Sequence, residues 1–506
     1  MLLVPVSLFS LRQDDATATL TRLTLLPKSE KRLSHHTTVD MSNLQLTLLL
    51  QTLCLTAATT TTSPSPSTTL TFLEDLATYT SLLNLPSNSL VNSTLAPMNK
   101  IGGTDHVFVN GNLARLLLST YILQPTESKN PIYKTQALGW CDTFTSLQAD
   151  LTSSHGNPAG YWGVGYGGLE NCSVPLRGDC AHSGDIYFGD TGTAVTALAL
   201  CWWHADDDTN TSESGTTTTT RKANYLSALQ KYATFVLEGS LVPPYNKKGT
   251  VASFINAHTG SVGCGYYKAT NRTEENCANI PGPSSLNCPS VHPYTIATGT
   301  TGGAFFAQLY AITGNVTYAN VAYNAMQYDA SVVLRDSTGE VPYILDGTNC
   351  TTLDSTTNQE CQSVGGPWPF DTISYVVEGL AAASLHLPKS MVNTTKWMEQ
   401  WKPTVDFLLK EQNNEGFWGV LGSGDLMRSP RCLTLLSWWV KTVDTSSYRD
   451  TPVHDAIDKY LVYLMKKVDP EYGLKLNTIT TGMVGLAVSD ALSFGSTFGG
   501  RTSAQE

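Results

Sequence analysis

The chain has 506 residues, a formal net charge of −11 and only 14% charged side chains. An acidic chain without a basic cluster cannot neutralise nucleic-acid phosphates, and an anionic membrane would repel it, so the charge excludes both kinds of partner. The length allows one large domain or several smaller ones.

The N-terminal part of the chain predicts a secretion signal. Residues 44–58 form an apolar run of signal-peptide length that ends in small residues and is too short to span a bilayer. Met41 stands just before this run. We therefore expect translation to start at Met41, residues 1–58 to be absent from the mature protein, and cleavage near Ala58. Residues 59–69 read as a Ser/Thr/Pro linker open to O-glycosylation.

Cysteine and sequon usage also favours secretion. Eleven cysteines occur, and one of them lies in the signal-like run. The ten others permit up to five disulfides in an oxidising compartment, with Cys172 and Cys180 a candidate local pair, and none has the CxxC spacing typical of zinc sites. Seven N-x-Ser/Thr sequons predict a glycoprotein; these sequons begin at Asn92, Asn171, Asn210, Asn271, Asn315, Asn349 and Asn393. We expect the protein to be a monomer.

Helix-length apolar patterns recur along the mature chain in two alternating kinds. The amphipathic kind is predicted near 71–85, 132–149, 221–238, 316–333, 396–411 and 452–467. The second kind is more apolar and rich in Gly, Ala and Thr, and it is predicted near 105–122, 191–204, 298–313, 371–387, 430–441 and 480–493. A helix that is apolar on nearly all sides must be buried, whereas a helix with one apolar stripe covers it. Six such pairs predict an all-α fold, an (α/α)6 toroid over residues 70–495, followed by a tail at 496–506.

The predicted loops are unequal in length. The outer-to-inner connections at 150–190, 239–297 and 334–370 are long, whereas most inner-to-outer connections are short. In a ring of hairpins all outer-to-inner loops lie on one face, and long irregular loops usually carry function. The active face is therefore expected where the inner helices begin.

An internal repeat relates the second and fifth hairpins. GYWGV at 160–164 recurs as GFWGV at 416–420, and Ser-Gly-Asp at 183–185 recurs as Ser-Gly-Asp at 423–425. Trp202-Trp203 recurs as Trp438-Trp439. The repeat predicts matching positions for Asp185 and Asp425, and likewise for Trp162 and Trp418.

A resemblance to known families follows from these elements. The stretch from Gln412 to Trp418 resembles the Q-x-x-x-G-x-W element of triterpene cyclases, but the acidic run from His204 to Asp208 lacks their D-x-D-D motif. Similar turns occur in many α/α toroids, and residues 70–495 as a whole resemble the six-hairpin glycosidase superfamily. That resemblance implies a ring of hairpins and a carbohydrate-active enzyme.

Four aspartates are candidate catalytic residues. Asp185 and Asp425 belong to the repeat, and Asp190 and Asp371 head inner helices, where each could instead be a helix N-cap. Glycoside hydrolysis uses one carboxyl group as an acid and a second as nucleophile or base, and helix N-termini favour ionised carboxylates. The first inner helix begins in the same way, with Asp105 and His106. By contrast, an inner helix is followed on the opposite face by Asp206, Asp207 and Asp208, which we interpret as a solvated loop. Adjacent aspartates do, however, serve some α-mannanases.

Aromatic and polar residues at the same loop-to-helix junctions are candidate substrate contacts. They are Trp162, His182, Tyr187, His292, Tyr294, Trp368, Trp418 and Arg428, with Arg431 nearby. The aromatic residues could stack on pyranose rings or simply fill the core. A Tyr/His pair beside an arginine could alternatively run β-elimination on a uronic acid.

The sequence therefore predicts a secreted carbohydrate-active enzyme without a cofactor, most simply a glycoside hydrolase that acts on an oligo- or polysaccharide. A polysaccharide lyase, a carbohydrate-binding toroid without catalysis, and a terpenoid cyclase or isomerase remain alternatives, because fold alone does not decide function. A G-x-S-x-G elbow, a G-x-G-x-x-G loop after a strand and a P-loop are all absent from the sequence.

Overall fold

The computed structural model describes residues 63–82, 107–163, 186–206, 220–241, 251–266, 289–333, 339–341, 344–346, 362–364, 369–419, 429–443, 452–467 and 478–499. The chain divides into Met1–Ser63 and Pro64–Glu506, and the second unit holds every described helix and strand. The predicted signal peptide at 44–58 and residues 59–62 of the predicted linker lie outside the described residues, and the first described helix begins at Pro66, within the predicted linker.

The helices alternate between an outer and an inner set, as the sequence predicts. The outer helices are α2 (Pro66–Leu82), α4 (Pro131–Ser146), α6 (Arg221–Glu238), α9 (Val316–Val333), α11 (Thr394–Glu411) and α14 (Pro452–Lys467). The inner helices are α3 (Val107–Leu123), α5 (Phe188–His204), the continuous run α7–η5–α8 (Thr295–Ala297, Thr298–Phe305, Phe306–Thr313), α10 (Pro369–His386), α13 (Cys432–Thr442) and α15 (Thr478–Leu492). The fifth inner helix begins at Cys432, two residues later than the expected Pro430, because Ser429 to Arg431 form a turn.

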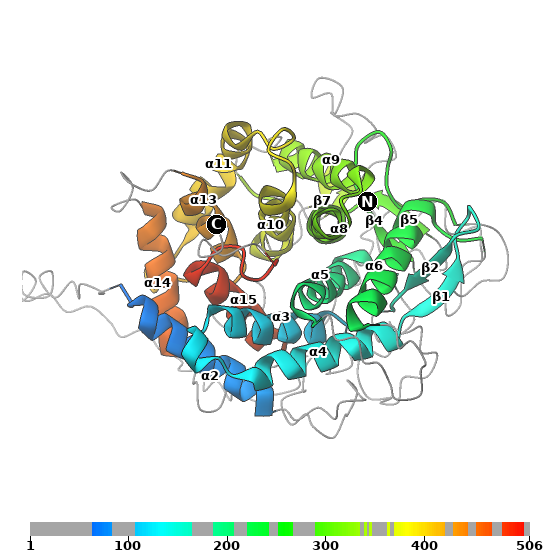
Figure 1. Ribbon diagram of the computed structural model, residues 1–506. Helices are drawn as coiled ribbons and strands as arrows, with labels where there is room; N and C mark the ends of the chain where they lie inside the picture. The colour runs from blue at the N-terminus through cyan, green and yellow to red at the C-terminus, as the bar shows by residue number, and fades with distance from the viewer. Residues whose placement is uncertain are drawn as a thin grey trace, which may run out of the picture. The chain divides into compact units, whose positions relative to one another are not determined.

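The inner helices close into a ring. Each packs against the next in the order α3, α5, η5, α10, α13, α15, and α15 packs back on α3. The outer helices surround this ring, and Figure 1 shows the two concentric layers. The unit is therefore an (α/α)6 toroid, as the sequence predicts.

Burial follows the two kinds of helix. In α3 every residue from Val107 to Thr120 is buried, whereas α6 buries one stripe at helical spacing that includes Tyr225, Leu229, Tyr232 and Val236. Helix starts after short inner-to-outer connections are capped locally; for example, Asn393 Oδ1 accepts a bond from the Lys396 N–H at 3.0 Å.

Short strands, which the helical periodicity did not predict, connect the long loops. In the described part, β1 (Ala149–Thr152) pairs with β2 (Pro158–Tyr161), and β6 (Ile344–Asp346) pairs with β7 (Gln362–Val364). The strand β4 (Gly263–Tyr266) lies between β3 (Ile186–Tyr187) and β5 (Pro289–Pro293), all antiparallel. Because β3 directly precedes α5 and β5 precedes α7, this sheet joins the loops of the second and third hairpins, which therefore share one face.

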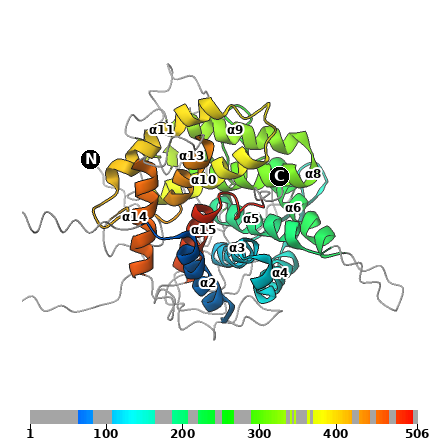
Figure 2. The ribbon, with the colours of Figure 1, turned by 60° about the vertical axis from the view of Figure 1, so that its left-hand side comes forward.

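The segment after α15 belongs to the core and is not an external tail. Phe498 is fully buried, and the guanidinium carbons of Arg115 and Arg431 lie 4.9 and 5.6 Å from its ring centre. The Phe498 carbonyl accepts bonds from Gln308 Nε2 at 3.0 Å and from His386 Nε2 at 2.8 Å. Figure 2 shows this red segment turning back among the inner helices. The expected domain boundary at 495 is therefore too early, and the domain continues through Gly499.

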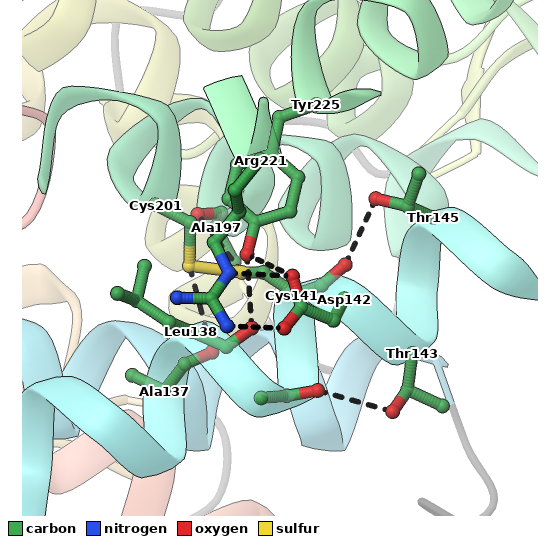
Figure 3. The surroundings of a disulfide bond; sticks show 11 residues. Ala137, Leu138, Cys141, Asp142, Thr143, Thr145, Ala197, Cys201, Arg221 and Tyr225 are labelled. Atoms are coloured by element: carbon green, nitrogen blue, oxygen red, sulfur yellow. Dashed lines mark hydrogen bonds and ion pairs between the residues drawn. A yellow bond between two sulfur atoms is a disulfide. The ribbon is translucent and has the colours of Figure 1, made fainter. Parts of the chain in front are cut away.

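One disulfide joins the second hairpin. Cys141 of α4 and Cys201 of α5, separated by 60 residues in sequence, are bonded to each other. Figure 3 shows the bond beside Asp142, whose carboxylate accepts two bonds from Arg221 at 3.0 and 2.9 Å and one from the Tyr225 hydroxyl at 2.6 Å. Cys432 keeps a buried free thiol 3.5 Å from the Phe370 carbonyl, so the ten cysteines outside the signal can form at most four disulfides. The suggested partners Cys172 and Cys180 lie outside the described residues.

Candidate active site

The end of the ring where the inner helices begin is called the mouth. Among the described residues, Asp190 and Asp371 are the carboxylates in the first turns of the inner helices. Each is the third residue of its inner helix, because α5 begins at Phe188 and α10 begins at Pro369. The N-cap interpretation is therefore wrong for both: the N-cap of α5 is Tyr187, and Asp371 lies inside the first turn of α10. Both side chains are partly exposed. A carboxylate in a first turn is stabilised by the positive end of the helix, so this placement favours the ionised form.

Two tyrosines stand at the starts of neighbouring inner helices. Tyr187 is the N-cap of α5 and Tyr294 is the N-cap of α7; both have an extended backbone, and neither caps its helix with its side chain. They are 9% and 8% exposed. A Cβ placed on Gly189 would lie 3.6 Å from Cε1 of Tyr294, so the Tyr294 ring covers the turn that carries Asp190.

Trp162 and Trp418 occupy matching places, as the repeat predicts, but both are core residues. Their exposed fractions are 1% and 0%. Trp162 Nε1 donates to the carbonyl of Phe144 and Trp418 Nε1 donates to that of Leu408, each bond 2.8 Å long and each to the last turns of the preceding outer helix. This burial favours the core-packing interpretation over sugar stacking for both indoles.

The match extends to neighbours that the sequence comparison missed. Trp162 packs on Tyr232 of α6, with ring centres 5.7 Å apart, and Trp418 packs on Tyr460 of α14 at 4.6 Å. The two preceding aromatic residues pack one helical turn further along the same helices, Tyr161 on Phe235 and Phe417 on Tyr463.

A glutamine completes the motif in both hairpins. Gln412 Nε2 donates to the Ala456 carbonyl, and Gln148 Nε2 donates to the Ala228 carbonyl, both at 2.8 Å. The first copy is hard to recognise in the sequence because the β1–β2 hairpin separates Gln148 from Gly160. In the sequence, a glutamine just after α4 and just after α11, followed later by Gly-aromatic-Trp, was the signal that could have revealed this match.

The centre of the ring holds a sealed ionic network. Arg115 Nη1 lies 3.0 Å from Glu378 Oε1, and Arg431 lies 3.4 Å from Glu378 and 3.3 Å from Asp490; all four side chains are at most 1% exposed. Burial raises the pKa of Asp490, opposed by the charge of Arg431. Arg431, which the sequence places at the mouth, is thus part of the interior. A charge inside an otherwise apolar helix was the signal for Arg115 and Glu378, because buried charges need partners.

Aromatic side chains approach each other across the ring nearer the mouth. The rings of Phe108 in α3 and Tyr375 in α10 have centres 5.7 Å apart. Phe108 is 5% exposed, and Tyr375 is partly exposed. These helices are the first and fourth of the inner ring, so the pair bridges the middle of the ring close to Asp371.

Other predicted site residues have no described side chain. Asp185, Asp425, His182, Trp368, Arg428, Asp105 and His106 lie outside the described residues, and His292 lies in β5, where only the backbone is described. Asp206 follows the C-terminal end of α5, is 58% exposed and pairs with Lys134 at 2.7 Å, as expected for a solvated loop. Among the described helices, none is long and apolar enough to cross a membrane.

Comparisons with known proteins give matches among solved structures only. No family model and no curated protein matches the chain. A glycosyl hydrolase family 88 protein from Bacteroides vulgatus is 10% identical over 85% of this chain and 99% of its own, with a TM-score of 0.48. A D-mannose isomerase is 12% identical over 83% and 97%, with a TM-score of 0.49. The family 76 α-mannanase of Bacteroides thetaiotaomicron is 11% identical over 76% and 86%, with a TM-score of 0.44.

Proposed function

We propose that this protein is a secreted glycoside hydrolase whose catalytic carboxylates stand at the mouth of the toroid. One observation carries the proposal: Asp190 and Asp371 are partly exposed in the first turns of two inner helices, whereas Glu378 and Asp490, deeper in the same ring, are sealed. Accessible carboxylates at the end of the ring where the long loops meet are what hydrolysis of a glycosidic bond requires.

The chemistry divides between two carboxyl groups. One donates a proton to the leaving glycosidic oxygen, and the other attacks the anomeric carbon or deprotonates a water molecule. The helix N-terminus favours an ionised partner, whereas the acid needs desolvation to raise its pKa. The mostly buried ring of Tyr294 lies against Gly189, the residue before Asp190, and supplies apolar surface at this turn. Asp185 and Asp425 remain candidates for the second carboxylate.

The test is hydrolysis of a panel of plant and fungal polysaccharides by the wild type, Asp190→Asn and Asp371→Asn. Loss of an acid or base should lower kcat by about 10²–10⁴-fold. Asp206→Asn is the matched control, because that exposed carboxylate lies at the opposite ends of the inner helices. Full activity in both mouth variants would remove these residues from the mechanism.

The same assay separates the alternatives. Unsaturated products that absorb in the ultraviolet would favour a lyase that uses Tyr294 with His182 and Arg428. Tight oligosaccharide binding without turnover in the wild type would favour a carbohydrate-binding toroid.

Secretion and glycosylation belong to the same proposal. The Cys141–Cys201 disulfide suits an oxidising compartment. The described sequon residues Asn315 and Asn393 are exposed and precede α9 and α11, at the end of the ring opposite the mouth, so glycans there would leave the mouth open. Mature protein should appear in the medium, begin near residue 59 and lose mass on deglycosylation; intracellular protein that retains Met1 would contradict this.

A further inference from the structure

The third inner helix contains a π-helical segment beside the turn that carries Asp190. Residues Thr298–Phe305 form a π-helix between α7 and α8, and all eight are buried. Widened helical turns of this kind are rare and occur frequently at functional sites. This segment packs directly on α5.

The contact between the two helices is a backbone contact made possible by Gly192. A Cβ on Gly192 would lie 2.7 Å from the backbone nitrogen of Thr301, and 2.5 and 2.6 Å from the hydroxyl oxygens of Thr301 and Thr300, so any larger residue would push the helices apart. The close approach lets two consecutive threonines of the π-helix reach the first turn of α5.

Both threonine hydroxyls face carbonyl groups of that turn. Thr301 Oγ1 donates to the Phe188 carbonyl at 2.6 Å. Thr300 Oγ1 lies 3.2 Å from the Phe188 carbonyl and 3.1 Å from that of Gly189, but also 2.9 Å from Ile296 in its own helix. Because a hydroxyl has one hydrogen, the bond from Thr301 is the better defined link between the helices.

Tyr232 holds the same turn from the outer layer. Its hydroxyl lies 2.7 Å from Thr191 Oγ1 and 3.1 Å from Thr301 Oγ1, and Thr191 Oγ1 donates to the Tyr187 carbonyl at 2.9 Å. The Tyr232 side chain and both threonine side chains are fully buried, so these bonds are protected from competing water.

We propose that Thr301 is a positioning residue that fixes the first turn of α5 and thereby the direction of the Asp190 carboxylate. The inference rests on the proposed function of Asp190, which lies two residues after Phe188. A rigid turn matters because a catalytic group displaced by about 1 Å can lose on the order of 10²-fold in rate.

The test compares three substitutions in buried threonines. Thr301→Val removes the donor and keeps the shape, and Thr301→Ser keeps the donor. Thr196→Val is the matched control, because within the described part of the chain Thr196 Oγ1 bonds only the Gly192 carbonyl of its own helix α5, at 2.9 Å. With the best substrate of the polysaccharide panel, Thr301→Val should lower kcat by about 10- to 100-fold with KM within about twofold of the wild type. Thr301→Ser should restore most of kcat, and Thr196→Val should match the wild type.

A second readout does not depend on catalysis. The amide hydrogens of Gly192 and Thr193 pair with the Phe188 and Gly189 carbonyls in a regular helix, so Thr301→Val should accelerate hydrogen exchange in a peptide that spans residues 188–194, and Thr196→Val should accelerate it less. Unchanged exchange and unchanged kcat in Thr301→Val would overturn the proposal, as would a Thr301→Ser variant as impaired as Thr301→Val. Faster exchange in a protein that hydrolyses no substrate would instead refute the proposed function and leave the positioning contact standing.

Discussion

Arg115 of the first inner helix and Glu378 of the fourth form an ion pair across the middle of the ring, with Arg115 Nη1 3.0 Å from Oε1 and 3.1 Å from Oε2. Both side chains are at most 1% exposed, and Arg431 shares the same carboxylate. Residues 263 positions apart in sequence thus depend on each other for charge compensation.

Removal of the shared carboxylate should destabilise the toroid strongly. Glu378→Gln leaves Arg115 and Arg431 with Asp490 as their described acidic partner, so the free energy of unfolding should fall by about 3–5 kcal/mol. Asp406→Asn, which breaks the exposed pair between Lys402 and Asp406 on one helix face, should cost about 0.5 kcal/mol or less. Denaturant titrations measure both; equal small losses would show that the buried network contributes no more than a surface pair.

The two buried indoles should behave as core residues. Trp162→Phe and Trp418→Phe each lose one hydrogen bond and some packing, so each should reduce stability by about 1–3 kcal/mol. KM for a polysaccharide substrate should stay unchanged, because neither ring is exposed. A raised KM with normal stability would restore the sugar-stacking interpretation.

The disulfide should contribute measurably to stability. It closes a loop of 60 residues, for which the chain-entropy model gives about 4 kcal/mol, and native disulfides typically contribute about 2–5 kcal/mol. The double variant Cys141→Ala/Cys201→Ala should therefore unfold at lower denaturant concentration. Reducing agent should destabilise the wild type more than the double variant; equal effects on both would assign the sensitivity to other cysteines.

His204, in the last turn of α5, should make the protein acid-sensitive. Burial, with help from Lys134, Lys129 and Lys222, lowers the pKa of His204 from 6.5 to about 4. As the pH falls, the unfolded chain therefore binds a proton at this histidine before the folded protein does. The contribution of neutral His204 to the free energy of unfolding is complete above pH 6.5 and is lost as the pH falls toward 4. The loss should reach about 3 kcal/mol, and His204→Gln should remove it; a variant with the pH dependence of the wild type would contradict this origin.

Asp329 should have the opposite pH dependence. This residue of α9 is fully buried, neither carboxylate oxygen has a hydrogen-bond partner among the described residues, and burial raises its pKa well above 3.8. The folded state therefore holds the proton after the unfolded chain has released it, and stability falls as the pH rises above 3.8. Asp329→Asn should stabilise the protein at pH 7 by about 1 kcal/mol or more and have little effect at pH 3. Equal effects at both pH values would exclude titration as the cause.

The candidate site could be located from the sequence only in part. Asp190 and Asp371 stand before apolar runs, and this pattern placed them at helix starts. The position of Asp190 inside the first turn was decided by tertiary structure: Tyr187 pairs with Gly265 in β3–β4, and α5 begins directly after this strand. The partner strand comes from the next hairpin, which no local pattern reveals.

The sequence by itself determined the helices and their layers, because the spacing of apolar side chains records which faces of a helix meet water. It also determined the repeated place of Trp162 and Trp418, since the aromatic motif has the same order in both hairpins. Only the tertiary structure decided which side chains meet inside the ring. The ion pair between Arg115 and Glu378, the burial of Phe498 and the bond from Thr301 to the Phe188 carbonyl join segments far apart in the chain. Such contacts exist only once six hairpins have closed into a circle, and local periodicity does not specify which side chains of different helices then face one another.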